Sequence, residues 1–357
     1  MESLFRDLRV LDMSTVLAGP SVGSFFAELG ATVIKIENPR TQGDVTRGWK
    51  LNNEDFNAPV SAYFSSINFG KTYRWLDLSN QEHRTEVNDL IRTSDIVLVN
   101  FKEGDDVKFG LTSEAIHAIQ PSAIYASLRG FASQSERIAY DVVLQAECGF
   151  MFMNGNESSG PLKMPVAMID VIAAHQLKEG ILCALIERMR SGKGSCVRVT
   201  LEEAALTALV NQASNFLMTG AIAQRVGSLH PNIAPYGETF RCSDDKELVL
   251  AVGSNSQFLL LCEMLNLREL EKDERFSMNQ HRVTNRLLLA RELQSAFATN
   301  TRDYWMDKFI AHGIPAGAIR SMDEVMSSGT AQRMIRNETM DGIQTSRISS
   351  VAFKLES

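Results

Sequence analysis

The chain has 357 residues, of which 44% are hydrophobic, and a formal net charge of −7. This length predicts two domains, or one domain with a large excursion. The negative charge argues against sequence-independent nucleic-acid binding, which requires a basic face. The five cysteines form no Cys-x-x-Cys pair, the N-terminus shows no signal pattern, and no apolar run approaches the ~20 residues of a membrane span. We therefore expect a cytoplasmic protein without membrane association.

The first forty residues follow the order strand, turn, helix, strand. Short apolar strands are expected at 9–13 and 32–37, and a helical run at 22–30 is closed by Gly30. This order is typical of a βαβ unit in a parallel sheet. The turn at 18–21 lacks the G-x-G-x-x-G pattern of dinucleotide-binding proteins. The helix start that follows it could still hold an anion.

Apolar segments of the same kind continue along the chain and predict further strands of a helix-covered sheet. These strands are expected at 73–78, 95–100, 123–128 and 196–201, with helices at 80–92 and from 201 to about 217. The composition changes at 221–235, where we expect a crossover into a second unit. That unit is predicted to contain a strand pair at 238–242 and 247–253 and helices at 256–267, 286–298 and 301–312.

A single carboxylate, Asp170, ends one apolar run and stands where a helical pattern begins. Ile172, Leu177, Ile181 and Leu185 then recur three to five residues apart. Asp is among the best helix N-capping residues, so capping is the first interpretation from these residues alone. The second is a nucleophile, because enzyme carboxylates form covalent intermediates. Unpaired backbone N–H groups at a helix start favour negative charge in either case.

Several stretches taken together resemble the class III CoA-transferases, the family of formyl-CoA transferase, carnitine CoA-transferase and α-methylacyl-CoA racemase. The matching stretches occur in order and span nearly the whole chain. They are LRVLDMSTVLAGP (8–20), LGATVIKIENP (29–39), GDVTR (43–47), the N-x-G-K…LDL segment (68–78), NFKEG…GL (100–111), YASLRGF (125–131), YDVVLQAECG (140–149), the Asp170 stretch, HPNIAPYGETF (230–240), FSMNQHRVTNR (276–286) and GIPAGAI (313–319).

The resemblance implies an α/β fold with a Rossmann-like large domain and a smaller α+β domain, and two chains interlocked into a homodimer. The large CoA-binding domain would cover 1–220, with 325–357 returning to it, and the small domain 221–324. Asp170 would be the nucleophile that carries CoA from an acyl-CoA to a carboxylic acid. Coenzyme A and acyl-CoA would be substrates, with no tightly bound cofactor and no metal.

The resemblance also assigns side chains that contact the substrate. The expected substrate and CoA contacts are Val16, Leu17, Ala18, Leu76, Asn100, Phe101, Lys108, Arg129, Tyr140 and Asp141. Arg47 and Lys71 match the motifs without an assigned role. Ordinary carboxylates are ionised at pH 7, so Asp170 is expected to need no base. The site must then supply oxyanion donors, for which the backbone N–H groups at a helix start are suited.

Departures from the family pattern bear on the substrate. Leu17 stands where formyl-CoA transferase has Gln, and 250–257 carries only Gly253, which argues against formyl or oxalate specificity. Tyr140 stands where the racemase branch has His, and Tyr is a poor base at neutral pH. A transferase is therefore favoured. An acyl-CoA racemase or epimerase on the same fold and a non-catalytic CoA-binding protein remain as alternatives.

Overall fold

The structure, a computed structural model, describes residues 4–133 and 137–356 and divides into two compact units. Unit 1 comprises Met1–Met151, Lys163–Ala223 and Gly329–Ser357, and unit 2 comprises Phe152–Leu162 and Gln224–Ser328. The C-terminal segment thus belongs to unit 1. The short excursion of 152–162 into unit 2 has no counterpart in the sequence prediction. Helices of the described residues are too short or too polar to span a membrane.

Unit 1 is built on a six-stranded parallel sheet. Its strands lie in the order β3 (Lys71–Trp75), β2 (Thr32–Glu37), β1 (Arg9–Met13), β4 (Ile96–Val99), β5 (Ile124–Arg129) and β6 (Ser195–Thr200). This is the doubly wound Rossmann order, in which the direction of winding reverses between β1 and β4. The predicted α/β class with a parallel sheet is confirmed. Ligands of such sheets bind beyond the carboxyl ends of the strands at that reversal.

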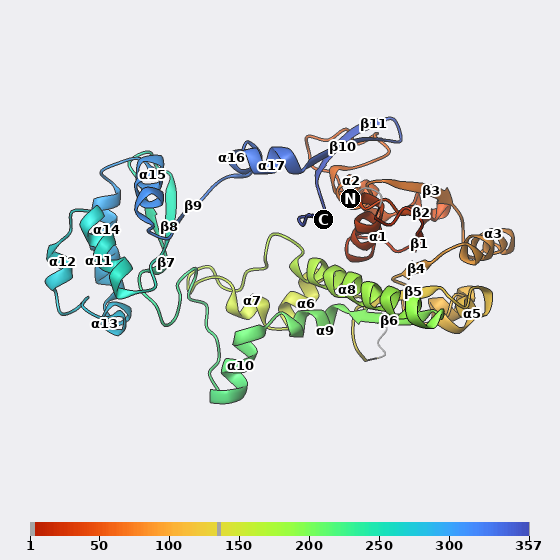
Figure 1. Cartoon of the computed structure of the whole chain (residues 1–357), viewed down its shortest axis with the longest axis horizontal. Helices are drawn as coiled ribbons and strands as arrows, with labels where there is room; N and C mark the ends of the chain where they lie inside the picture. Colours follow the sequence, from red (N-terminus) through yellow and green to blue (C-terminus); the bar gives the residue numbers. More distant parts are fainter. Residues whose placement is uncertain (1–3, 134–136, 357) are drawn as a thin grey trace. The chain divides into compact units, whose positions relative to one another are not determined.

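Helices cover both faces of this sheet because its strands are apolar on both faces (Figure 1). Along β1, Val10 packs on one face and Leu11 on the other. The first face is covered by α1 (Ala18–Glu28), α6 (Asp141–Glu147), α8 (Met168–Ser191) and α9 (Leu201–Thr207). The second face is covered by α3 (Gln81–Arg92) and α5 (Ser113–Ile119). The 24-residue α8 therefore lies directly against the sheet, with Asp170 in its first turn.

The rest of unit 1 surrounds this core. It contains η1 (Pro39–Thr41), η2 (Val45–Gly48), α2 (Ala62–Ile67), α4 (Asp105–Phe109), α7 (Phe150–Met153, which runs on into unit 2), α10 (Val210–Thr219), α17 (Gly329–Met334) and the hairpin β10 (Ile335–Met340)–β11 (Ile343–Ile348). The hairpin packs on α2 through Met340 and Phe64. Glu28 of α1 accepts hydrogen bonds from Arg347 and from the backbone of Ser350, each at 2.9 Å, and so ties the C-terminal segment to unit 1.

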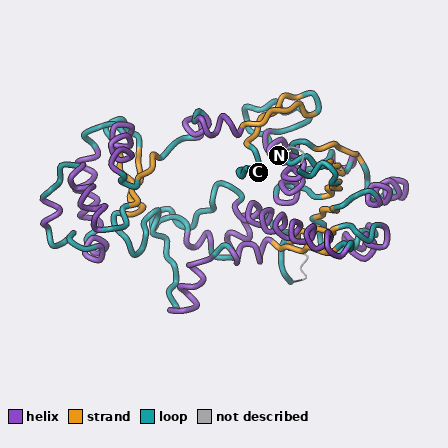
Figure 2. Tube along the Cα trace, viewed as in Figure 1, coloured by secondary structure: helices purple, strands orange, loops and turns teal. Residues whose placement is uncertain are grey.

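Unit 2 packs three short antiparallel strands against helices (Figure 2). Its elements are β7 (Tyr236–Arg241), β8 (Glu247–Ala251), α11 (Asn255–Met264), α12 (Glu269–Lys272), α13 (Asn279–Thr284), α14 (Arg286–Phe297), α15 (Arg302–His312), β9 (Ala316–Ala318) and α16 (Met322–Met326). Phe240, Phe258, Phe297 and Trp305 form the centre of its own core.

Several elements differ from the sequence prediction. The turn expected at 18–21 is instead the first turn of α1, which runs from Ala18 to Glu28 and not from residue 22 to residue 30. The strand expected at 73–78 begins and ends earlier, as β3. The helix expected to run to about residue 217 is broken into α9 and α10, and Val210 at the break has a positive φ of 42°. The hairpin β10–β11 was not predicted. Most residues of its two strands are polar, so the sequence shows no apolar run or regular apolar alternation there.

Candidate active site

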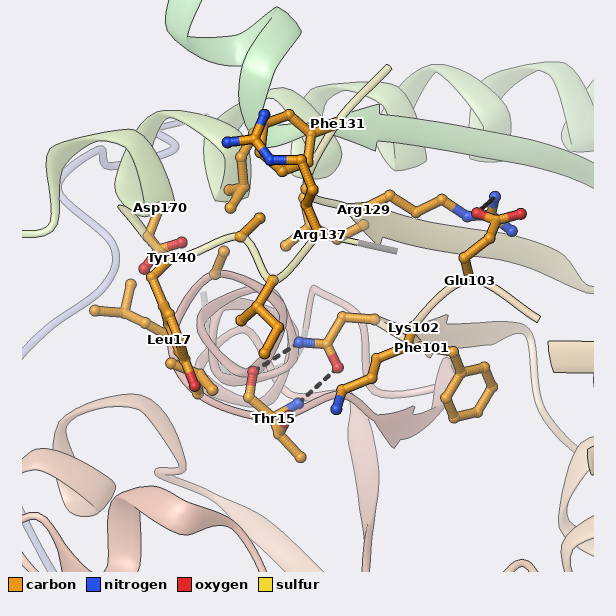
Figure 3. A pocket seen from close by; sticks show the side chains of 18 of the residues that line it. Thr15, Leu17, Phe101, Lys102, Glu103, Arg129, Phe131, Arg137, Tyr140 and Asp170 are labelled. Carbon is orange, nitrogen blue, oxygen red and sulfur yellow. Dashed lines mark hydrogen bonds and ion pairs between the residues drawn. The ribbon is translucent and has the colours of Figure 1, made fainter. Parts of the chain in front are cut away.

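A cavity of about 450 Å³ lies in unit 1 where the carboxyl ends of β1, β4 and β5 meet, next to the reversal of the sheet (Figure 3). The lining comes mainly from the loops after these strands and from the first turn of α8. The residues are Thr15, Val16, Leu17, Ala18, Val45, Asn100, Phe101, Lys102, Glu103, Leu128, Arg129, Gly130, Phe131, Ser133, Arg137, Ile138, Ala139, Tyr140, Asp170 and Leu201. Its size is that of an ordinary small-molecule site.

Most of the predicted site residues line this cavity, although they come from four distant segments. Those that do are Val16, Leu17, Ala18, Asn100, Phe101, Arg129, Tyr140 and Asp170. Leu76 does not, because its side chain is buried in the core beneath α3 and α5. Lys108 does not either: it lies exposed on α4, with its Nζ 3.9 Å from Asp105. Asp141 does not line the cavity either, and its carboxylate instead accepts hydrogen bonds from the start of α8.

Asp141, and not Asp170, caps the helix that carries the candidate nucleophile. The N-cap position of α8 is Ala167, and Asp170 is the third residue of the helix, so the N-cap interpretation of Asp170 is wrong. Asp141 Oδ1 accepts the N–H of Ile169 at 2.7 Å and that of Asp170 at 3.4 Å. Gln145 donates its side-chain amide to Asp141 Oδ2 at 2.5 Å. A carboxylate from α6 therefore holds the first turn of α8 and leaves the Asp170 side chain free for the cavity.

Burial and the neighbouring charge change the acidity of Asp170. The residue is only 8% exposed, and among the described residues no cation forms an ion pair with it. Burial, and then the charge of Asp141, raise the pKa of Asp170 to about 7. The expectation of an ordinary, fully ionised carboxylate at neutral pH is therefore wrong.

The N–H groups at the start of α8 are already used. Those of Ile169 and Asp170 point to Asp141, that of Met168 donates to the Val166 carbonyl at 2.8 Å, and that of Val171 donates to Ala167 at 3.1 Å. The helix that carries Asp170 therefore does not supply the expected oxyanion donors.

The other helix start in the cavity does have donors to offer. No acceptor within residues 4–133 and 137–356 takes the N–H groups of Leu17, Ala18 and Gly19 at the start of α1, as expected for a first helical turn. Leu17 and Ala18 share the cavity with Asp170, and Figure 3 shows Leu17, Tyr140 and Asp170 on the same side of it. Unpaired backbone N–H groups thus occur at the start of α1, in residues that share the cavity with Asp170.

Asn100 fixes the turn that leads into α1. Its side-chain oxygen accepts the N–H of Thr15 at 3.0 Å, and its side-chain nitrogen donates to the Thr15 carbonyl at 2.8 Å (Figure 3). The loops after β1 and β4 are thereby joined at the floor of the cavity. Asn100 was predicted as a substrate contact, and its amide is engaged with the protein itself.

The cations of the cavity differ in how far their charge is compensated. Arg129 pairs with Glu103 at 2.7 Å and with Asp106 at 3.1 Å, so two carboxylates offset its charge. Arg137 lies over the Phe131 ring and pairs with Glu147. Lys102 lines the cavity and has no ion-pair partner among the described residues. The sequence prediction did not select it, although it directly follows the Asn-Phe motif.

The sequence prediction also did not select Tyr63, or Trp49, which packs on it. Burial, followed by the charges of Asp170, Asp141 and Asp44, raises the pKa of Tyr63 to about 12, so this α2 residue lies within electrostatic reach of Asp170. Trp49 packs edge-on against Tyr63 with ring centroids 5.0 Å apart. No local motif marks either residue, since their neighbours come from distant segments.

The motif residues Arg47 and Lys71 turn out to be buried within the protein. Arg47 pairs with Glu37 at 2.7 Å and with Asp341 of the hairpin at 2.9 Å. Lys71 pairs with Asp12 at 2.8 Å beneath α1, where Gly23 leaves room because a Cβ there would lie 2.7 Å from the Asp12 carboxylate. Both side chains are engaged in ion pairs within unit 1, and neither lines the cavity.

A buried carboxylate and free backbone donors in one cavity at the reversal of a doubly wound sheet fit a group-transfer enzyme. The family model described as CoA-transferase family III matches residues 5–355, and the chain belongs to this family and is a CoA-transferase.

Relatives with named activities and a solved structure support this assignment. The succinate–glutarate CoA-transferase of Agrobacterium fabrum is 34% identical over 335 residues, which are 91% of this chain and 82% of that protein. The acetyl-CoA:oxalate CoA-transferase of Acetobacter aceti is 31% identical, over 93% of this chain and 84% of that protein. The crystal structure of a CAIB/BAIF family protein from Brucella suis superimposes with a TM-score of 0.85 at 35% identity, over 97% of this chain and 91% of that one.

Proposed function

We propose that the chain moves CoA from an acyl-CoA to a carboxylic acid through a CoA thioester on Asp170. The observation that carries this proposal is a buried carboxylate, without a cationic partner in the described part of the chain, that shares a cavity with the free N–H groups of α1. Coenzyme A enters as part of the substrate, and the proposal requires no tightly bound cofactor.

The proposed reaction exchanges one thioester for another in four balanced steps. The Asp170 carboxylate attacks the acyl-CoA carbonyl, the C–S bond breaks, and an aspartyl–acyl anhydride and CoA thiolate result. The thiolate attacks the aspartyl carbonyl, which forms the aspartyl-CoA thioester and releases the first acid as its carboxylate. The acceptor carboxylate then attacks this thioester, and the released thiolate attacks the acceptor carbonyl of the second anhydride. The products are the new acyl-CoA and free Asp170.

The geometry of the cavity supports the proposed steps. Each addition places negative charge on a carbonyl oxygen, and the N–H groups of Leu17 and Ala18 are the proposed donors to it. One such donor contributes about 3 kcal/mol to the transition state. The pKa of about 7 for Asp170 keeps a reactive fraction ionised at neutral pH while making the carboxylate more basic than usual. No separate base is needed.

The proposed CoA site extends from this cavity over the large unit. Lys102, whose charge is not offset, is the cavity residue best suited to a phosphate of CoA. Lys108, exposed on α4, remains a proposed contact for the outer part of CoA. Leu76, whose side chain is buried, is proposed to contribute only its backbone. The names of the relatives suggest succinyl-CoA and a small dicarboxylic acid as the substrate pair, and Leu17 argues against oxalate.

The racemase alternative is disfavoured by Asp141. A racemase needs two bases, one on each side of the α-carbon, and here Tyr140 replaces the histidine while Asp141 is engaged in capping α8.

We also propose the interlocked homodimer. Large apolar side chains on α8 and α10 stand in solvent in the single chain: Met189 is 87% exposed, Leu217 81% and Met218 85%. Exposed apolar side chains of this kind offer a surface on which a second chain can pack. Light scattering on the purified protein is expected to give twice the chain mass, and a monomer at micromolar concentration would contradict the proposal.

Isotope exchange tests the proposed function without knowledge of the second acid. Labelled succinate should appear in succinyl-CoA when the two are incubated with the enzyme alone, because the first half of the reaction is reversible. The D170N variant should show no exchange. Deuterium from solvent appearing at the α-carbon of an acyl-CoA, with no exchange of the acid, would instead identify a racemase.

A further inference from the structure

The turn before α1 holds a residue in an unfavourable backbone conformation. Val16 has a φ of +74°, in the left-handed region that β-branched residues avoid. It lines the cavity, and the free N–H groups of Leu17 and Ala18 follow it directly. Such a conformation persists only where the surrounding structure holds it.

A buried ion pair beneath the turn supplies that hold. The side chains of Lys35 and Asp44 are fully buried, with Nζ and Oδ2 3.2 Å apart. Both carboxylate oxygens of Asp44 accept the N–H of Val16, at 3.3 and 3.2 Å. Lys35 donates to the carbonyl of Ser14 at 2.6 Å. The two side chains of the ion pair therefore hydrogen-bond to the backbone of the same turn, on either side of Thr15.

The pair is anchored independently of the cavity. Asp44 also accepts the N–H of Thr46 at 3.1 Å and its hydroxyl at 2.8 Å, and neither Lys35 nor Asp44 lines the cavity. The start of α1 packs closely on the turn, because a Cβ on Gly19 would lie 2.4 Å from the Ser14 Cβ. A shift of the turn would therefore displace the first turn of α1.

We infer that Asp44 is a positioning residue for the reaction: it keeps Val16 in its left-handed conformation and thereby keeps the Leu17 and Ala18 N–H groups in place at the cavity. Lys35 offsets the buried charge of Asp44 and holds the carbonyl on the other side of the turn. This inference rests on the proposed function, which assigns those N–H groups to the oxyanion.

The inference predicts an effect on kcat and not on substrate binding. Oxyanion donors act mainly when negative charge develops in the transition state, so their displacement lowers kcat and leaves KM for the acyl-CoA nearly unchanged. If Asp44 only stabilised the fold, its replacement would change the amount of active protein, and a substitution that relaxes the backbone of Val16 would not restore activity.

Two double variants separate the hydrogen-bond acceptor from the charges. K35M/D44N and K35M/D44L both remove the buried ion pair, so neither leaves an unpaired buried charge. Only the first keeps an oxygen for the Val16 N–H. We expect K35M/D44N to stay within ~5-fold of the wild-type kcat, and K35M/D44L to lose ~100-fold, the size of one lost oxyanion donor. KM for acyl-CoA should change less than ~3-fold in both. Should the leucine variant not fold, K35M/D44A makes the same comparison.

Glycine at the strained position supplies the decisive readout. Gly adopts the left-handed region at no steric cost, so adding V16G to K35M/D44L should recover ~10-fold or more of kcat. If the loss of kcat came from a packing defect near Thr46, V16G would not restore it. The matched control is E324Q, which removes the carboxylate that binds buried Arg302 at 2.6 Å in unit 2, and it should leave kcat unchanged.

The outcomes distinguish this inference from the proposed function. Equal kcat for the asparagine and leucine variants, or no recovery with V16G, would overturn the positioning role while wild-type exchange on Asp170 stands. Absence of isotope exchange in the wild-type enzyme would overturn the proposed function first.

Discussion

Replacing Asp170 with Asn is expected to abolish CoA transfer and to stabilise the folded protein. The pKa of Asp170 is about 7, against 3.8 for an ordinary Asp, because of burial and then the charge of Asp141. Since the folded-state pKa is raised, stability is highest below the ordinary pKa and falls as the pH rises towards 7. A tenfold difference in proton affinity corresponds to about 1.4 kcal/mol, so the ionised carboxylate destabilises the folded state by about 4 kcal/mol at pH 8.

The D170N variant removes this ionisation at similar size and shape. Its gain in unfolding free energy should be about 4 kcal/mol at pH 8 and about 2 kcal/mol at pH 5, where only the unfolded chain ionises. For a chain of this length the gain at pH 8 corresponds to about 5 °C in Tm. Thermal unfolding of both proteins at the two pH values measures it. A variant no more stable than wild type at pH 8, or an equal gain at both pH values, would refute the reasoning.

Three further predictions follow from the site and its support. D141N should move the acidic limb of the pH profile of kcat/KM to lower pH, because it removes a charge that raises the pKa of Asp170. The asparagine keeps an oxygen that can accept the N–H of Ile169 and cap α8. An unmoved acidic limb would contradict this prediction. K102A should raise KM for acyl-CoA ~10-fold, the size of a lost hydrogen bond to a charged group. R129A should raise it less than ~3-fold, because two carboxylates offset the charge of that arginine. Steady-state kinetics of both variants tests which KM rises more. K71M should lower the unfolding free energy by about 3–5 kcal/mol, because it leaves a buried carboxylate unpaired; urea unfolding would show an unchanged midpoint if the pair were unimportant.

The sheet was predictable because its strands bury both faces. Residues 9–13 and 32–37 are apolar runs bounded by turn residues, and they form β1 and β2 with the predicted bounds. The hairpin β10–β11 was not predictable in this way, since it buries little beyond Met340. Its place depends on partners far away in sequence, such as Arg47 with Asp341.

The sequence allowed most residues of the cavity to be predicted, but not the hydrogen bonds and electrostatic interactions between them. The ordered motifs pointed to Asp170 and to the turn at Val16–Ala18, and the structure brings these into one cavity. The cap on α8, the raised pKa of Asp170 and the position of Tyr63 depend on contacts between residues from 28 to more than 100 positions apart. No local pattern encodes such contacts, because each arises only when the sheet and its helices are assembled.

Mass spectrometry of the enzyme after addition of acyl-CoA alone tests the central claim most directly. The account predicts a CoA adduct on the peptide that contains Asp170, which borohydride reduces to the side-chain alcohol and which added acceptor acid removes. The adduct should be missing in D170N. A CoA or acyl adduct on a cysteine, or an unmodified Asp170 under conditions of turnover, would contradict it.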